Sequence, residues 1–198
     1  SGCLFPTGHE TLQEAEEAML ALYVDRGQLA DGQEILELGC GWGSLSLYLA
    51  ERFPAAQITA VSNSSTQRRF IENEKRLRGL DNVSVVTADM NSFDITERRF
   101  DRIVSIEMLE HMKNYEMVLA KVSSWLQPHG RMIVQSLGNR RFAYDFKTTD
   151  WMGKYFFAGG TMPSRDLLEN FLPADLTQSR VWDVDGRQYS RTLDAWLE

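Results

Sequence analysis

The stretch Glu34–Gly43, with the sequence EILELGCGWG, decides the fold that this chain is expected to adopt. Its first half, Glu34–Leu38, is short and mainly apolar, which indicates a buried strand. The glycines that follow allow the backbone to turn sharply and to approach a ligand closely. A helical pattern then runs over Ser44–Phe53 and stops at Pro54. A strand, a glycine-rich loop and a helix in this order are typical of ligand-binding α/β proteins.

The same alternation continues on both sides of this stretch. Upstream, Thr11 and Glu14 form a capping-box pattern, and apolar residues then recur at helical spacing up to Gly27. Downstream, the pattern predicts strands over Ile58–Val61, Val83–Thr87, Phe100–Ile106 and Arg131–Leu137, and helices over Ser65–Arg78 and Tyr115–Leu126. Strands that alternate with helices predict a mainly parallel sheet with right-handed crossovers. The expected fold class is therefore α/β, Rossmann-like, with helices on both faces of the sheet.

The regularity ends after the last of these strands. Residues 138–163 are rich in aromatic side chains, which would form either plain core or a lid over an apolar substrate. Beyond them the pattern predicts a helix from near Ser164, a strand over Ser179–Val184, a tight turn at Asp185–Gly186 and the start of a helix at Leu193–Glu198.

Composition narrows the class of protein. The chain has 198 residues, enough for one domain (residues 1–198), and its formal net charge of -7 without a basic run disfavours a nucleic-acid partner. No apolar run approaches the roughly 20 residues of a membrane span and no secretory leader is visible, so we expect a cytoplasmic protein. Cys3 and Cys40 are too few for a disulfide scaffold. No cluster has metal-ligand spacing, and His9 and His129 are expected at the surface or in loops.

The glycine loop is the strongest sign of a ligand. Its glycines alternate, and Glu37 stands two positions before the first of them. This pattern resembles the loop that binds the amino-acid part of S-adenosylmethionine (SAM), with Glu37, Gly39, Cys40 and Gly41 as the binding residues. A dinucleotide fingerprint differs, because its third glycine lies three positions after the second and an acid follows the next strand. A glycine turn without a ligand is the other alternative.

The ends of the following strands supply further candidates for cofactor binding. Ser62, Asn63 and Gln67 follow the second strand, where their hydroxyl and amide groups could bond a ribose or merely cap the next helix. Asp89 and Met90 follow the third strand and resemble the methyltransferase position at which an acid binds the adenine amino group and an apolar neighbour covers the ring. Ser105, near the end of the fourth strand, completes the predicted cofactor set.

Longer segments make the resemblance specific. Ser105–Tyr115 (SIEMLEHMKNY), Asp150–Ser164 (DWMGKYFFAGGTMPS) and Ser1–Phe5 (SGCLF) resemble the coclaurine N-methyltransferase and cyclopropane-fatty-acid synthase family of SAM-dependent methyltransferases. The resemblance covers essentially the whole chain. It implies the class I methyltransferase fold, SAM as cofactor and S-adenosylhomocysteine (SAH) as product. It also implies that relatives continue beyond both ends of this sequence.

The resemblance assigns roles in the acidic segment. It implies that Glu107, Glu110 and His111 face the substrate. A glutamate at position 107 is closer to the plant-type amine N-methyltransferases and their bacterial relatives, because the lipid cyclopropane synthases generally lack it. Tyr189 is a further candidate, either as a pocket hydroxyl or as an ordinary strand residue.

In the cyclopropane synthases, the equivalents of Glu110, Cys3 and Tyr189 belong to a bicarbonate-binding cluster. Two other members of that cluster are usually histidine and isoleucine, where this chain has Gln135 and Leu137. The missing histidine disfavours a bicarbonate-assisted mechanism. The N-methyltransferases usually have a histidine there too, so the resemblance also implies an unusual substrate preference.

The expected reaction is N-methylation of a small aromatic or alkaloid-like amine. A protonated amine has no lone pair, so carboxylates that bind the ammonium and a histidine that takes or relays its proton suit this chemistry. The first alternative is methylene or methyl transfer to unsaturated phospholipid acyl chains, with membrane contact. The second is a SAM-binding domain without catalysis, and the acidic residues could also simply begin a helix. A monomer and a homodimer are both compatible with the sequence.

Overall fold

The central sheet is the frame on which the rest of the chain is arranged. The computed structural model describes residues 1–197. Five parallel strands follow the order β3-β2-β1-β4-β5. Their bounds are Glu34–Leu38 for β1, Gln57–Ser62 for β2, Val83–Thr87 for β3, Phe100–Ile106 for β4 and Leu126–Gln135 for β5. The strand order reverses between β1 and β4, and ligands of open α/β sheets bind outside the carboxyl ends of the strands at such a point.

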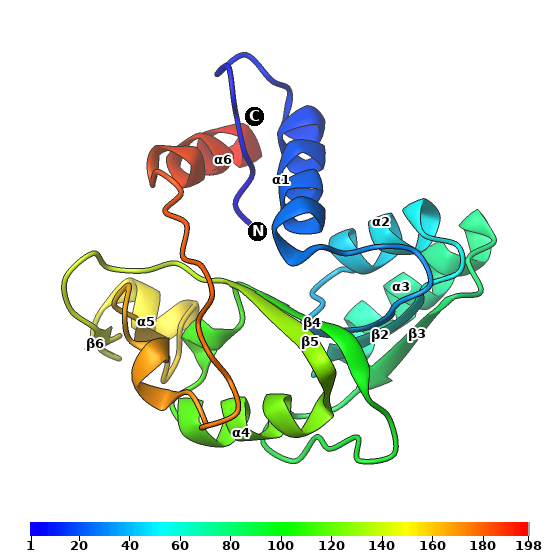
Figure 1. Cartoon of the computed structure of the whole chain (residues 1–198). Coiled ribbons are helices and arrows are strands. Elements are labelled where there is room, and N and C mark those ends of the chain that lie inside the picture. Colours follow the sequence, from blue (N-terminus) through cyan, green and yellow to red (C-terminus); the bar gives the residue numbers. More distant parts are fainter. Residues whose placement is uncertain (198) are drawn as a thin grey trace.

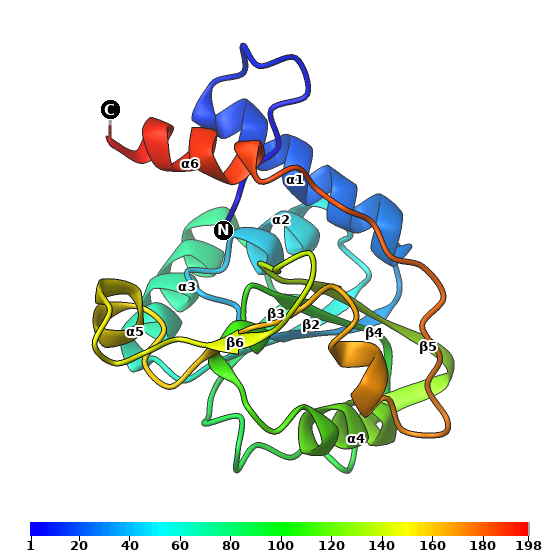
Figure 2. The same cartoon turned by 90° about the vertical axis from the view of Figure 1, so that its left-hand side faces the viewer.

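Helices cover both faces of this sheet (Figures 1 and 2). They are α1 (Leu12–Gly27), α2 (Ser44–Arg52), α3 (Ser65–Arg78) and α4 (Tyr115–Trp125). Because side chains alternate along a strand, Ile35 packs with α1 and α2, whereas Leu36 and Leu38 face α4 on the other side. Both faces of the sheet are therefore buried, as the mainly apolar strands predict.

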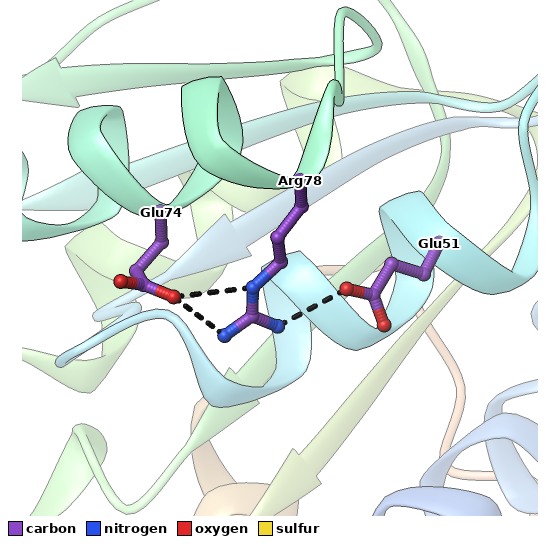
Figure 3. A network of polar contacts seen from close by, with 3 residues as sticks. All are labelled: Glu51, Glu74 and Arg78. Carbon is purple, nitrogen blue, oxygen red and sulfur yellow. Dashed lines mark hydrogen bonds and ion pairs between the residues drawn. The ribbon is translucent and has the colours of Figure 1, made fainter.

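The helices also contact one another at the ends that lie away from the strands' carboxyl edge. Arg78, the last residue of α3, binds Glu74 of its own helix at 2.7 Å and Glu51 of α2 at 3.1 Å (Figure 3). The three side chains are partly exposed, so this network is a surface feature of the α2–α3 layer.

The C-terminal part forms a cap over the carboxyl edge of the sheet. It contains a short antiparallel pair, β6 (Tyr144–Asp145) and β7 (Thr161–Met162), the helix α5 (Trp151–Tyr155) and the helix α6 (Arg187–Leu197). The N-terminal segment runs between α1 and α6 (Figure 1). Its backbone N–H groups bind α6, with Cys3 donating to Thr192 Oγ1 at 2.9 Å and Phe5 donating to Gln188 Oε1 at 2.7 Å.

The predicted α/β fold is confirmed, and α3 begins and ends at the predicted residues. The predictions for the C-terminal part were less accurate. The strand expected over Ser179–Val184 was wrong, because this segment is an exposed irregular connection. The helix expected near Ser164 is only a short 3-10 turn over Leu168–Phe171. The strand expected over Arg131–Leu137 begins earlier and ends at Gln135.

The region around Asp185 also differs from its prediction. The tight turn expected at Asp185–Gly186 is instead the start of α6, where the Asp185 carboxylate accepts the N–H of Arg187 at 2.9 Å. This helix was expected only from Leu193. Tyr189 consequently lies on a helix and not on a strand. None of the helices in residues 1–197 has the length and apolar character that crossing a bilayer requires.

Candidate functional site

The glycine loop at the end of β1 has a conformation that side chains would prevent. Gly39, Gly41 and Gly43 have φ angles of +80°, +53° and +85°. A Cβ at Gly39 would lie 2.5 Å from Met108, and one at Gly43 would lie 2.7 Å from Ile71. The N–H groups of Gly39 and Cys40 both donate to the Val61 carbonyl of β2, at 3.0 and 2.9 Å. The loop is therefore fixed against the sheet by its own backbone.

A pocket of about 170 Å³ opens beside this loop. Its walls come from the loop, from α1 and from the N-terminus, and they include Gly2, Cys3, Met19, Tyr23, Glu37, Gly39, Cys40, Gly41, Trp42 and Ile106. The predicted cofactor residues Glu37, Gly39, Cys40 and Gly41 are thus brought together in one pocket.

Glu37 gives this pocket a chemical preference. Its carboxylate is buried and accepts a hydrogen bond from the Ser46 hydroxyl of α2. Burial raises the pKa of Glu37 to about 7. A buried carboxylate is stabilised by a cationic partner, so the pocket suits a ligand that carries an ammonium group.

The other predicted cofactor residues lie along the same edge of the sheet but do not line this pocket. The Ser62 hydroxyl donates to Gln67 Oε1 at 2.6 Å, and Asn63 is exposed. The N-cap of α3 is Ser64, whose hydroxyl accepts the N–H of Gln67. The Ser62 hydroxyl in turn accepts the N–H of Ser64 at 3.0 Å, so its side chain is engaged at the start of α3. Asp89 is exposed and binds the backbone and side chain of Asn91, both at 2.8 Å.

Met90 and Ser105, the remaining predicted cofactor residues, differ in burial and in hydrogen bonding. Met90 is half-buried against the apolar cluster under α4. Ser105 is fully buried in β4, and its hydroxyl has no hydrogen-bond partner among the described residues. Ser105 is therefore an unpaired polar group inside the sheet, whereas Met90 offers an apolar surface at its edge.

The acidic segment follows β4 directly. Glu107 has a φ of +49°, which is a rare conformation for a residue other than glycine. Its carboxylate accepts the N–H of Gly2 at 2.8 Å and the side-chain amide of Gln135 at 3.1 Å. Tyr189 lies close by, because a Cβ at Gly2 would be 3.1 Å from the Tyr189 ring and 3.4 Å from the Glu107 carboxylate. The N-terminus, β4, β5 and α6 therefore meet at Glu107.

Glu110 is the most deeply buried acid of the site. It lies in the 3-10 turn Leu109–His111, and one carboxylate oxygen accepts the N–H of Leu137. The other oxygen, Oε2, is buried without a partner among the described residues. Burial, the largest cause, and the nearby Glu107 raise the pKa of Glu110. Neither acid begins an α-helix, because Glu107 precedes the short 3-10 turn that contains Glu110 and α4 starts only at Tyr115.

His111 and Tyr189 complete the predicted catalytic set. The His111 ring lies 5.0 Å from the ring of Phe157, which in turn stacks on Phe146 at 4.5 Å, so the cap contacts the acidic segment. Partial burial lowers the pKa of His111. Burial and the charges of Glu107 and Glu110 raise the pKa of the Tyr189 phenol. His111 is thus favoured as a neutral base, and Tyr189 as a protonated hydroxyl.

The aromatic segment is mostly not core. Trp151, Tyr155 and Phe156 are exposed, and only Phe157 is buried. These side chains therefore do not form plain core, and the lid alternative stays a prediction. Within residues 1–197, no group of three or more His, Cys, Asp or Glu side chains could hold a metal ion.

Sequence reasoning missed several residues that line the pocket, among them Gly2, Tyr23 and Trp42. Tyr23 follows Met19 at helical spacing, so it was indistinguishable from a core residue of α1. Gly2 reaches the site only because the N-terminal segment folds back over the sheet edge. No local sequence signal reports such a contact.

Comparisons with known proteins relate the chain to one family. A family model described as mycolic acid cyclopropane synthetase matches residues 1–198. The chain is 40% identical over 203 aligned residues to (S)-coclaurine N-methyltransferase of Thalictrum flavum subsp. glaucum, covering 100% of this chain and 56% of that protein. It is 31% identical over 199 residues to cyclopropane-fatty-acyl-phospholipid synthase of Escherichia coli strain K12, covering 99% of this chain and 49% of the relative.

A solved structure is also similar over the whole chain. The crystal structure of coclaurine N-methyltransferase bound to N-methylheliamine and SAH superposes with a TM-score of 0.92 and 39% identity, covering 100% of this chain and 59% of the other. The chain thus spans about half the length of the curated relatives that it matches.

Proposed function

The chain belongs to the mycolic acid cyclopropane synthetase family, and we propose that it is a SAM-dependent methyltransferase that N-methylates a small amine. The observation that carries this proposal is the pair of acids, Glu107 and Glu110, beside the pocket. Glu110 holds a buried carboxylate oxygen that has no hydrogen-bond partner in the described part of the chain, which suits a ligand that brings a positive charge or a donor. The similarity to coclaurine N-methyltransferase, whose structure holds SAH and N-methylheliamine, supports the same reaction class.

The pocket fits the amino-acid end of SAM. Glu37 would bind its ammonium group, and the glycine loop would bring backbone N–H groups close to its carboxylate. Ser62, Gln67, Asp89 and Met90 lie farther along the sheet edge, where they would bind the adenosine part. When bound, SAM supplies a methyl group that its sulfonium has already activated.

The other residues of the site would act on the amine that accepts the methyl group. Glu107 and Glu110 would bind the ammonium form of the amine and orient it toward the pocket. His111, kept neutral by its lowered pKa, would take or relay the proton so that the nitrogen regains its lone pair. Gln135, which donates to Glu107, keeps that carboxylate in place without itself titrating. The aromatic cap would exclude water from the reacting atoms.

A second candidate is methylene or methyl transfer to unsaturated phospholipid chains. The observation that favours it is the exposed aromatic surface of the cap, with Phe142, Trp151 and Phe156, which could contact a lipid surface. Similarity to the E. coli synthase points in the same direction, at a lower identity than to the N-methyltransferases.

The test is formation of SAH by the purified chain with SAM, measured in parallel on cyclic and aromatic amines and on vesicles of unsaturated phospholipid. We expect turnover on amines, with a rate that falls as the pH drops and the amine is protonated. Turnover on vesicles alone would replace the amine proposal with the lipid candidate. SAH binding without turnover on either substrate would show a binding domain and contradict both.

A further inference from the structure

Tyr23 has a buried hydroxyl without a protein partner. The residue lies on α1 and is 4% exposed, and its hydroxyl oxygen forms no hydrogen bond to any described residue. A buried polar group that stays unpaired costs folding free energy, so it usually has a partner that is missing from the structure. Tyr23 also lines the pocket beside the glycine loop, which places the missing partner in that pocket.

The surroundings of the hydroxyl define what this partner can be. Burial, the largest cause, and the carboxylates of Glu107 and Glu37 raise the pKa of the Tyr23 phenol, so the group remains a hydrogen-bond donor. The Gln135 side chain lies near the hydroxyl and lowers its pKa, but it does not reach hydrogen-bonding geometry with it. Because Glu16 and Glu37 also line the pocket, a ligand carboxylate that enters it meets negative charge. Such a carboxylate needs donors on the protein side to offset this repulsion.

We infer that Tyr23 is a cofactor-positioning residue whose hydroxyl donates a hydrogen bond to the carboxylate of the amino-acid moiety in this pocket. This inference rests on the proposed function, because it takes SAM and SAH as the ligands. In this arrangement Glu37 binds the ammonium group of the amino-acid moiety, and the Tyr23 hydroxyl binds its carboxylate. The bond fixes the amino-acid end on α1 in addition to the loop.

If Tyr23 had only a structural role, its ring would matter and its hydroxyl would not. The Tyr23 ring belongs to the apolar cluster formed by α1, α2 and the sheet, together with Met19 and Leu45. The ring therefore contributes to packing, and Phe would keep that contribution. The hydroxyl forms no hydrogen bond to a described residue, so we expect that its removal leaves the stability of the ligand-free protein unchanged and separates the two roles.

The experiment compares Tyr23→Phe with the wild-type chain by calorimetric binding of two ligands, SAH and decarboxylated SAH, which lacks only the carboxylate. Wild type should bind SAH at least about tenfold more tightly than the decarboxylated ligand, as expected for a hydrogen bond to a charged group. Y23F should lose about tenfold in SAH affinity and bind the decarboxylated ligand as wild type does. Its melting temperature without ligand should not fall.

Tyr115→Phe is the matched control, because Tyr115 also has a buried hydroxyl without a hydrogen-bond partner in residues 1–197 but does not line the pocket. It should leave both affinities unchanged. Equal SAH affinity in Y23F and wild type would overturn the inference and leave the proposed function intact, as would equal weakening of both ligands or a lower melting temperature with unchanged binding. Failure of the wild-type chain to bind SAH would overturn both.

Discussion

The two halves of the site are built in different ways. The cofactor half, which consists of Glu37 and the loop Gly39–Gly43, is one continuous stretch whose shape follows from its glycines. The acceptor half, which consists of Glu107, Glu110, His111 and Tyr189, is assembled from β4, its following turn and α6, and the N-terminus joins it through Gly2. The first half depends on local backbone conformation, and the second depends on contacts between distant segments. We therefore expect that a substitution in one half can change the reaction rate or the SAH affinity without affecting the other half.

The largest expected effect is the fall in the methylation rate caused by Glu110→Gln. The amide keeps the size of the side chain and removes its charge, so we expect the rate of amine methylation to fall by about 10²–10⁴-fold, the usual contribution of acid–base and charge assistance. SAH affinity should change less than about twofold, because Glu110 does not line the cofactor pocket. Steady-state rates and calorimetric SAH binding measure the two effects.

The control for this prediction is Glu116→Gln on the exposed side of α4. It removes a carboxylate from the same part of the chain without touching the acceptor half, and its rate should match wild type. A large loss of SAH affinity in Glu110→Gln would show that the two halves are not separable.

A second test breaks the cofactor half through its backbone. Gly43→Val adds a side chain where φ is +85° and where a Cβ would lie 2.7 Å from Ile71. We expect a loss of about 2–4 kcal/mol in the free energy of unfolding, from backbone strain and overpacking together, and weaker SAH binding. Denaturant titration measures the loss.

Gly32→Val isolates the packing contribution. Gly32 also has a positive φ, +76°, but a Cβ there would meet nothing within 4 Å. This variant should lose only about 1–2 kcal/mol, the cost of the left-handed backbone. Equal losses in the two variants would mean that Ile71 moves aside and that Gly43 is needed for its conformation alone.

The same contrast explains what the sequence could predict. The parallel sheet and the cofactor half follow from local patterns, because the order of apolar runs, glycines and helix caps determines them within about 30 residues. The acidic segment was found through its resemblance to a family. Tyr23 and Gly2 were not found, since only tertiary contacts bring them to the pocket. The segment after Leu137 was predicted least well, because its structure depends on packing over the sheet edge. The helix α6 was expected only from Leu193, although its apolar residues recur at helical spacing from Arg187 onward.

We expect the stability of the protein to depend on pH through Glu37 of the cofactor half. Burial raises the pKa of Glu37 from 4.5 to about 7, so the folded protein holds a proton that the unfolded chain releases. The contribution of Glu37 to the free energy of unfolding is fully present below pH 4.5. It is lost as the pH rises through 7, by an amount on the order of 3 kcal/mol. Denaturant titrations between pH 5 and pH 7.5, compared with Glu37→Gln, measure this slope.

Glu37→Gln carries no titratable group, so the difference between the two proteins removes the contribution of all other acids. The variant should be less sensitive to pH across this range and should bind SAH more weakly, because the ammonium group loses its carboxylate partner. Parallel pH profiles of wild type and variant would contradict the burial of an uncompensated acid at this position.

The smallest effect is expected from the network in Figure 3. Arg78→Ala removes contacts to Glu74 and Glu51 that are all partly exposed, so the free energy of unfolding should fall by about 0.2–1 kcal/mol, and less in high salt. SAH affinity should not change. Both helices present their N-terminal ends to the ligand edge of the sheet, whereas Arg78 and Glu51 lie at their C-terminal ends. A measurable loss of SAH binding would show that the α2–α3 layer transmits strain to the glycine loop, and the cofactor half would then be less local than its sequence suggests.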